Sequence, residues 1–258
     1  IQENVPYKEL IPFAESIHSD RLLRENNEKM RQEFTANVSH ELKTPLTSIS
    51  GYAELIETGI AKSADVPEFG RKIHVEASRM IQLVNDILQL SHLDNVSETN
   101  DTPQMETVDL LDVAKECVER QKVNAQKSFI SLTYLGESAP VLGSRSLLDE
   151  LCQNLCDNAI RYNRPGGKVQ LITSCTRDGH CTLTVKDNGI GIPKDAQSSV
   201  FERFYRVDKS HSKKIGGTGL GLSIVKHAVA YHHGTLRLES QPGKGTVITV
   251  TLPKKPTE

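Results

Sequence analysis

A histidine stands beside an acid and one helical turn before a hydroxyl group in the segment FTANVSHELKTPLTSISGYAEL, residues 34–55. His40 and Thr44 are four residues apart, so a helix would place them on one face, with Glu41 next to the histidine. A neutral imidazole on a solvated helix can act as a nucleophile, and a neighbouring carboxylate can accept its proton or hold its tautomer. A lone histidine on a helix is usually an ordinary surface residue, but this grouping favours chemistry. Pro45 would bend or loosen the helix just beyond it.

Two asparagines stand four residues apart in ELCQNLCDNAIRY, residues 150–162. Asn154 and Asn158 offer neutral carbonyl oxygens on one helical face, and such oxygens suit a hard cation. Magnesium keeps several waters and takes one or two protein ligands plus phosphate oxygens, so amides suffice where a triphosphate supplies the negative charge. Solvated helix residues or caps would show the same pair, which leaves both interpretations open.

Two glycine-rich segments follow, DNGIGIP at 187–193 and GGTGLGLSIV at 216–225. Gly189 and Gly191 let the backbone approach a ligand closely, and the carboxylate of Asp187 can accept a hydrogen bond from an amino group such as that of adenine. The second segment opens into a helix, and its amides suit phosphates. A plain turn could use the first segment, and neither GxxxxGK[ST] nor GxGxxG is present, so either segment alone is weak evidence.

Composition and charge exclude few classes of protein. The 258 residues fit two domains of about 100–200 residues each. Lys and Arg number 31 against 33 Asp and Glu, a net charge of −2, so we expect no nucleic-acid partner. No apolar run approaches the roughly 18–20 residues of a membrane span, so we expect this chain to be soluble. It begins with Ile rather than Met, and we expect a fragment of a protein that is membrane-anchored at full length.

The five cysteines are an odd number at irregular spacing, which predicts reduced thiols and a cytoplasmic setting. Cys152 and Cys156 are one helical turn apart, but no CxxC motif or nearby histidine pair completes a zinc site. We interpret both as small buried apolar residues.

Apolar periodicity predicts two long helices, one over residues 19–57 and a second from Pro67 to about residue 93, joined by a turn at 58–65. Together they would form an antiparallel hairpin. Two helices cannot enclose a core, so we expect the hairpin to pair with a copy of itself as a homodimeric four-helix bundle. The polar, aperiodic residues 95–107 predict a linker between domains.

Mixed helix and strand patterns follow the linker and predict a two-layer α/β sandwich, so the fold class is α+β. The expected helices are 109–127, 146–162, 193–205 and 219–233. The expected strands are 129–135 and the hairpin pairs 169–176 with 181–186 and 235–240 with 246–252.

Taken in order, five segments closely resemble the catalytic core of a sensor histidine kinase of a two-component system. VSHELKTPL is similar to the phosphoacceptor box and NLCDNAIRY to the asparagine box. DNGIGIP, FERFYRVD and GGTGLGLSIV are similar to the first glycine, phenylalanine and second glycine boxes. The resemblance implies a signalling helix with a dimerisation and histidine-phosphotransfer hairpin at 1–94, a linker at 95–107 and a Bergerat-type ATP-binding domain at 108–258.

The resemblance also implies an activity and its residues. His40 would be phosphorylated from ATP, Glu41 would assist the transfer, and the phosphoryl group would pass to an aspartate on the receiver domain of a response regulator. Thr44 matches the position that orients a water when the regulator is dephosphorylated.

For the nucleotide, Asn158 is similar to the principal Mg²⁺ ligand, with Asn154 supporting it, and Asp187 to the adenine-binding carboxylate. Arg161 stands where lysine is common and would grip phosphate oxygens. The other nucleotide-binding positions implied are Tyr162, Gly189, Gly191, Arg206, Gly217, Thr218, Gly219, Leu220, Gly221 and Thr246. We interpret Phe201 and Phe204 as core residues on a helix, and residues 205–218 as a lid.

Two alternatives stay open. An ATPase of the gyrase type would share the nucleotide-binding motifs, but the hairpin that carries His40 opposes it. A non-catalytic dimeric scaffold would share the hairpin, but it would have no need of Asn158, Asp187 and the glycine boxes.

Overall fold

The computed structural model describes residues 11–95, 104–176, 178–207 and 217–253. The chain divides into two compact units, residues 1–80 and 81–258, so the division falls within the second helix. Within the described residues, no helix combines the length and the apolar character that crossing a membrane requires.

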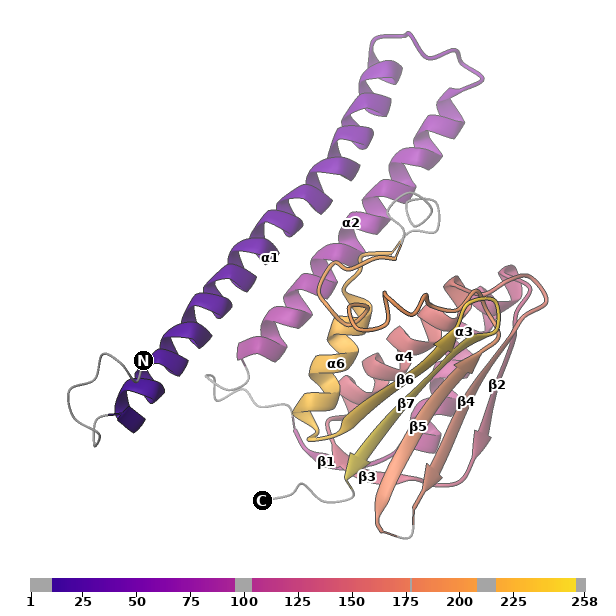
Figure 1. Ribbon diagram of the computed structural model, residues 1–258. Helices are drawn as coiled ribbons and strands as arrows, with labels where there is room; N and C mark the ends of the chain where they lie inside the picture. Colours follow the sequence, from indigo (N-terminus) through magenta and orange to yellow (C-terminus); the bar gives the residue numbers. More distant parts are fainter. Residues whose placement is uncertain (1–10, 96–103, 177, 208–216, 254–258) are drawn as a thin grey trace. The chain divides into compact units, whose positions relative to one another are not determined.

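The first two helices, α1 (Ile11–Glu57) and α2 (Val66–Asn95), form the predicted hairpin (Figure 1). α1 begins earlier than the periodicity indicated and continues through Pro45. At the turn, Gly59 adopts a φ of +71°. Close to the turn, the rings of Tyr52 and Phe69 pack with their centroids 5.3 Å apart, which joins the two helices.

The second unit is built on a five-stranded sheet with the strand order β2–β4–β5–β7–β6. Strand β2 is parallel to β4, and the other neighbours are antiparallel. The bounds are β2 (Ser131–Gly136), β4 (Lys168–Cys175), β5 (His180–Asp187), β6 (Thr235–Gln241) and β7 (Gly245–Pro253). Burial alternates along β5, where Cys181, Leu183 and Val185 point to one face, as a strand with one covered face requires.

Three helices cover that face of the sheet: α3 (Leu110–Lys127), α4 (Arg145–Arg161) and α6 (Gly221–Tyr231) (Figure 1). The core between the two layers is apolar; its fully buried side chains include Leu148, Leu151, Leu155, Leu171, Leu183 and Leu252. The predicted two-layer sandwich is therefore confirmed. A second, two-stranded antiparallel sheet of β1 (Glu106–Asp109) and β3 (Pro140–Gly143) was not predicted, and β1 begins inside the predicted linker.

The helix predicted over residues 193–205 is wrong, because the structure has successive turns there. The amides of Ser199 and Glu202 each donate to a carbonyl three residues back, at 3.0 and 2.9 Å. Phe204 then takes a φ of +62°, which no right-handed helix contains. Spacing of apolar residues alone does not distinguish such turns from a helix.

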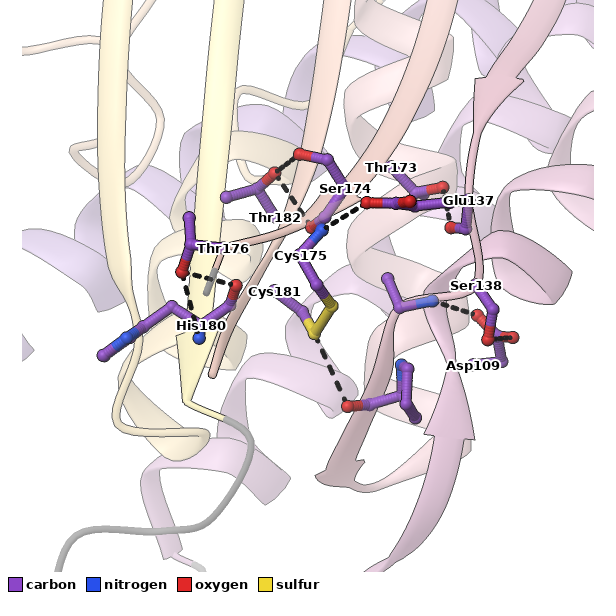
Figure 2. The surroundings of a disulfide bond; sticks show 12 residues. Asp109, Glu137, Ser138, Thr173, Ser174, Cys175, Thr176, His180, Cys181 and Thr182 are labelled. Carbon is purple, nitrogen blue, oxygen red and sulfur yellow. Dashed lines mark hydrogen bonds between the residues drawn. A yellow bond between two sulfur atoms is a disulfide. The ribbon is translucent and has the colours of Figure 1, made fainter. Parts of the chain in front are cut away.

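Three of the five cysteines behave as predicted, since Cys117, Cys152 and Cys156 are free and buried. The prediction of reduced thiols is wrong for the other two, because Cys175 and Cys181 form a disulfide (Figure 2). They lie directly opposite each other on the antiparallel strands β4 and β5, with their Cα atoms 4.1 Å apart. The strand register creates this proximity, and spacing in the sequence does not display it.

Candidate functional site

Asp187 ends β5, and the backbone holds one oxygen of its carboxylate. The amides of Gly189 and Thr246 donate to Oδ1 at 2.8 and 3.2 Å. In the described part of the chain Oδ2 accepts no hydrogen bond, so Oδ2 is the oxygen that a ligand can reach. Burial raises the pKa of Asp187 above its ordinary value, while the two amides act in the opposite direction. A fixed carboxylate with one open oxygen suits an amino-group donor.

The loop after Asp187 fits between the end of α4 and the turn after β6. A Cβ at Gly189 would collide with the carbonyl oxygen of Tyr162, and that carbonyl accepts the amide of Ile190 at 3.1 Å. Gly191 adopts a φ of +70°, and a Cβ there would collide with the carbonyl oxygen of Gln241. Both positions therefore require glycine, as the motif predicted.

Ser240 on β6 supports this loop, and the sequence analysis missed it. Its hydroxyl accepts the amide of Ile192 at 2.8 Å, donates to the carbonyl of Gly245 at 3.0 Å and lies 2.9 Å from the hydroxyl of Thr246. Thr246 is buried and acts on Asp187 through its amide. Only the strand register that pairs Ser240 with Thr246 could have revealed this role.

Two guanidinium groups and a phenol meet above Gly217. A Cβ at Gly217 would lie 3.0 Å from Nη1 of Arg161, 3.5 Å from the hydroxyl oxygen of Tyr162 and 4.0 Å from Nη2 of Arg206. Arg161 also pairs with Asp157, at 2.8 Å from Nη2 to Oδ2. Guanidinium groups hold phosphate oxygens through two parallel hydrogen bonds, so this end of the site suits phosphates.

The start of α6 lies beside the two asparagines. A Cβ at Gly221 would lie 2.9 Å from Oδ1 of Asn154 and 3.8 Å from Nδ2 of Asn158. The N-cap residue is Leu220, and no side chain among the described residues caps the helix, so amides at this helix start are available to an anion. The hydroxyl of Thr218 accepts the amide of Leu220 at 3.3 Å.

This donor set fits magnesium held together with a phosphate ligand. Amide oxygens are hard, neutral ligands, and they stand beside amides that can hold the anion. Among the described residues, no group of three or more His, Cys, Asp or Glu side chains could hold a metal ion by itself. A cation held by Asn154 and Asn158 would therefore need further oxygen atoms from the bound phosphate compound.

The phenylalanine segment supports the second glycine segment. The amide of Phe204 donates to the carbonyl of Gly219 at 2.9 Å. Gly219 adopts a φ of +75°, and a Cβ there would lie 2.9 Å from the Cα of Phe204. Most of the predicted lid, residues 208–216, lies outside the described residues.

The candidate phosphoacceptor group lies on α1. His40 and Thr44 are exposed, and the hydroxyl of Thr44 donates to the carbonyl of His40 at 3.2 Å. Glu41 points toward α2, where its Oε2 lies 3.4 Å from Nη2 of Arg79; the two side chains are 26% and 22% exposed. The sequence analysis missed Arg79, because it stands 38 residues away and only the hairpin register brings it to Glu41.

The predicted site residues thus form two groups. His40, Glu41 and Thr44 lie together on α1. The second group gathers the ends of α4 and β5, the start of α6, the two glycine segments and β7; it contains Asn154, Asn158, Arg161, Tyr162, Asp187, Gly189, Gly191, Arg206, Gly217, Thr218, Gly219, Leu220, Gly221 and Thr246.

Two family models match the chain. Residues 30–96 match the His Kinase A (phospho-acceptor) domain, and residues 143–256 match the histidine kinase-, DNA gyrase B-, and HSP90-like ATPase. The first match includes His40, and the second includes the asparagine pair and both glycine segments.

Three known proteins illustrate the similarity. The sensor-like histidine kinase SenX3 of Mycolicibacterium smegmatis is 41% identical over 95% of this chain, which spans 63% of that protein's length. The solved mycobacterial sensor histidine kinase MprB is 35% identical, with a TM-score of 0.51 over 60% of this chain and 100% of that one. The histidine kinase ThkA, solved in complex with response regulator protein TrrA, shares the fold at 19% identity, with a TM-score of 0.66 over 97% of this chain and 68% of that one.

Proposed function

This chain belongs to the sensor histidine kinases of two-component systems, and we propose from that premise that it transfers the γ-phosphoryl group of ATP to His40. The observation that carries the proposal is the pair of sites. One site offers a single open carboxylate oxygen and a set of phosphate-binding groups, and the other offers an exposed imidazole beside a carboxylate.

The α/β unit binds and orients ATP in this proposal. Oδ2 of Asp187 accepts the adenine amino group, because Oδ1 is already held by the amides of Gly189 and Thr246. Arg161 and Arg206, together with the amides at the start of α6, receive phosphate oxygens. Asn158, with Asn154 beside it, would hold magnesium, which when bound offsets charge on the β- and γ-phosphates.

His40 is the nucleophile. A lone pair of its imidazole attacks the γ-phosphorus, the bond from that phosphorus to the β,γ-bridging oxygen breaks, and ADP leaves with the bonding electrons. The imidazole proton passes to the carboxylate of Glu41. Arg79 is a positioning residue in this scheme, since its guanidinium holds Glu41 from α2.

Incubation of the chain with γ-labelled ATP and magnesium tests this proposal. We expect label on the protein that is lost in acid and retained in alkali, as a phosphoramidate bond requires. Release of free phosphate with no labelled protein would instead favour the ATPase interpretation. Neither labelled protein nor free phosphate, with ATP still bound, would favour the scaffold.

A homodimer is part of the proposal. The hairpin helices expose apolar side chains that a single chain leaves uncovered; they include Leu46, Val75, Ile81, Val84 and Leu88. On α2, Ile81, Val84 and Leu88 follow one another at three and four residues, the spacing of a helix-bundle seam. Burying this stripe against a second copy would complete the four-helix bundle. Sedimentation of the full chain should therefore give a dimer at micromolar concentration.

The exposed phosphohistidine would then donate its phosphoryl group to an aspartate on a response regulator. We propose that the same helix face also assists hydrolysis of the aspartyl phosphate on that regulator. Thr44 lies one turn from His40 with its hydroxyl bonded to the His40 carbonyl, so the hydroxyl can reorient to a water. Thr44→Ala should impair dephosphorylation of the regulator at least about tenfold while changing autophosphorylation less than about twofold. Equal losses in both activities would contradict the water-orienting role.

A further inference from the structure

The disulfide lies at one end of the β4–β5 hairpin, and Asp187 lies at the other end of β5. Its two sulfurs have different surroundings. Cys181 is fully buried, whereas Cys175 is only partly buried at the margin of the core. An external thiol or disulfide can therefore reach the sulfur of Cys175 before that of Cys181.

Hydrogen bonds hold the hairpin end without help from the disulfide (Figure 2). On one side of the cysteine pair, the hydroxyls of Ser174 and Thr182 lie 2.9 Å apart. On the other side, the amide of Thr176 donates to the carbonyl of His180 at 2.7 Å, and the Thr176 hydroxyl donates to the same carbonyl at 3.2 Å. Reduction would thus leave the two thiols facing each other, ready to be oxidised again.

The sulfur of Cys181 also has a hydrogen-bond acceptor nearby that its reduced thiol could use. Sγ of Cys181 lies 3.6 Å from the carbonyl oxygen of Pro140, within reach of a thiol hydrogen bond (Figure 2). In the disulfide this sulfur carries no proton, so the hydrogen bond can form only after reduction. Both redox states of the buried sulfur are therefore accommodated by the same surroundings.

The surroundings connect the cysteine pair to the β1–α3 junction. The amide of Cys175 donates to the Glu137 carboxylate at 3.4 Å. Two residues further along, the amide of Ala139 donates to Asp109 at 2.8 Å, and Asp109 caps α3 by accepting the amide of Leu111 at 2.9 Å. Opening of the hairpin end would therefore loosen the start of α3 rather than the nucleotide site.

We propose that Cys175 and Cys181 form a reversible thiol–disulfide modification site that exchanges with low-molecular-weight disulfides and thiols. In oxidation, the Cys175 thiolate attacks one sulfur of the small disulfide, a mixed disulfide forms and one small thiolate leaves. The Cys181 thiolate then attacks Sγ of Cys175 and expels the second. The two protein protons end on the two released thiols, and reduction reverses each step.

Alkylation of the full, folded chain in buffers of stepped reduced-to-oxidised glutathione ratio tests the proposal. We expect Cys175 to gain an alkyl group as the ratio rises and to lose this reactivity when the ratio is lowered again, while the fully buried Cys181 stays unmodified. The buried Cys117, Cys152 and Cys156 are internal controls that stay unmodified. A disulfide that resists dithiothreitol, or a Cys175 that is alkylated equally at every ratio, would overturn the proposal.

Two single variants test the order of attack. With oxidised glutathione, Cys181→Ala should accumulate a mixed disulfide on Cys175, whereas Cys175→Ala should leave the buried Cys181 unmodified. The reverse pattern would contradict the assigned roles. ATP affinity is also measured for the oxidised and the reduced wild-type chain. We expect it to change less than twofold, because the amides that hold Asp187 lie near the end of β5 opposite the disulfide.

Discussion

The proposed nucleotide site and the proposed phosphoacceptor group are constructed in opposite ways. In the α/β unit, backbone amides, glycines without room for a side chain and a packed core determine where each ligand group falls. On α1, His40 and Thr44 stand exposed, and Glu41 forms an ion pair with Arg79. In the proposed function, ATP would be bound by groups that the fold already holds in place, while His40 would stay accessible, as a group that has to meet both ATP and a protein acceptor requires.

The largest effect should come from removing the nucleophile. His40→Gln should abolish phosphoryl incorporation while the affinity for ATP changes less than about twofold, because the two regions do separate tasks. His74→Gln, at an exposed position on α2, is the matched control and should label normally. Labelling and calorimetric nucleotide titration of both variants check this. Loss of ATP binding in His40→Gln would contradict the division of tasks.

The next largest effect should come from Asp187→Asn, which keeps Oδ1 for the amides of Gly189 and Thr246 but replaces the open oxygen by an amide donor. Two donors would then face each other, and ATP affinity should fall at least about 50-fold. Calorimetric titration measures the loss. Affinity within a few-fold of the unaltered chain would show that Oδ2 does not bind the nucleotide.

The Asp187→Asn variant should not lose folding stability at neutral pH. The difference in stability between the variant and the unaltered chain depends on pH. Because the folded pKa of Asp187 is raised, the stability that its protonation contributes is full below the ordinary pKa and is lost as pH rises through the folded pKa. At neutral pH the ionised carboxylate is therefore a cost that Asn removes. Melting curves should place Asp187→Asn at or above the unaltered chain at pH 7, and this advantage should disappear in acid.

A smaller effect should come from Arg79→Gln, which frees Glu41 from its partner on α2. We expect labelling to slow by about tenfold, less than the roughly 10²–10⁴-fold that a positioned acid–base group contributes, because Glu41 itself is retained; ATP affinity should not change. Arg79→Lys should restore part of the rate, and Arg71→Gln, an exposed control on α2, should have no effect. An unchanged rate in Arg79→Gln would remove Arg79 from the account.

The last comparison concerns folding stability, at glycines in the two regions. Gly191→Ala should cost about 3 kcal/mol, because a positive φ adds to the collision with Gln241. Gly243→Ala, with a φ of +76° but open space, should cost only about 1–2 kcal/mol. Gly70→Ala, exposed in α2 with open space, should instead stabilise by about 1 kcal/mol. Denaturant unfolding checks the order, and equal costs at Gly191 and Gly243 would show that no collision occurs.

The sequence alone predicted the elements whose signal is local. The hairpin stripe, the alternation in β5 and the glycines at 189 and 191 each follow from neighbouring residues, and the structure agrees. The 193–205 segment failed because its turns imitate helical spacing until Phe204 takes a positive φ.

The parts that could not be predicted depend on register. Arg79 reaches Glu41 across the hairpin, and Ser240 reaches Thr246 across β6 and β7. Cys175 meets Cys181 for the same reason. Pairings of this kind are determined by tertiary packing, and a single sequence carries no direct signal for them.

Mass-spectrometric localisation of the phosphoryl group tests the central claim most directly. The full chain, incubated with ATP and magnesium and digested at alkaline pH, should carry one phosphoryl group, on His40, and brief acid treatment should remove it. A phosphoryl group on Ser39 or Thr44, or an unmodified His40 peptide beside released phosphate, would contradict the account.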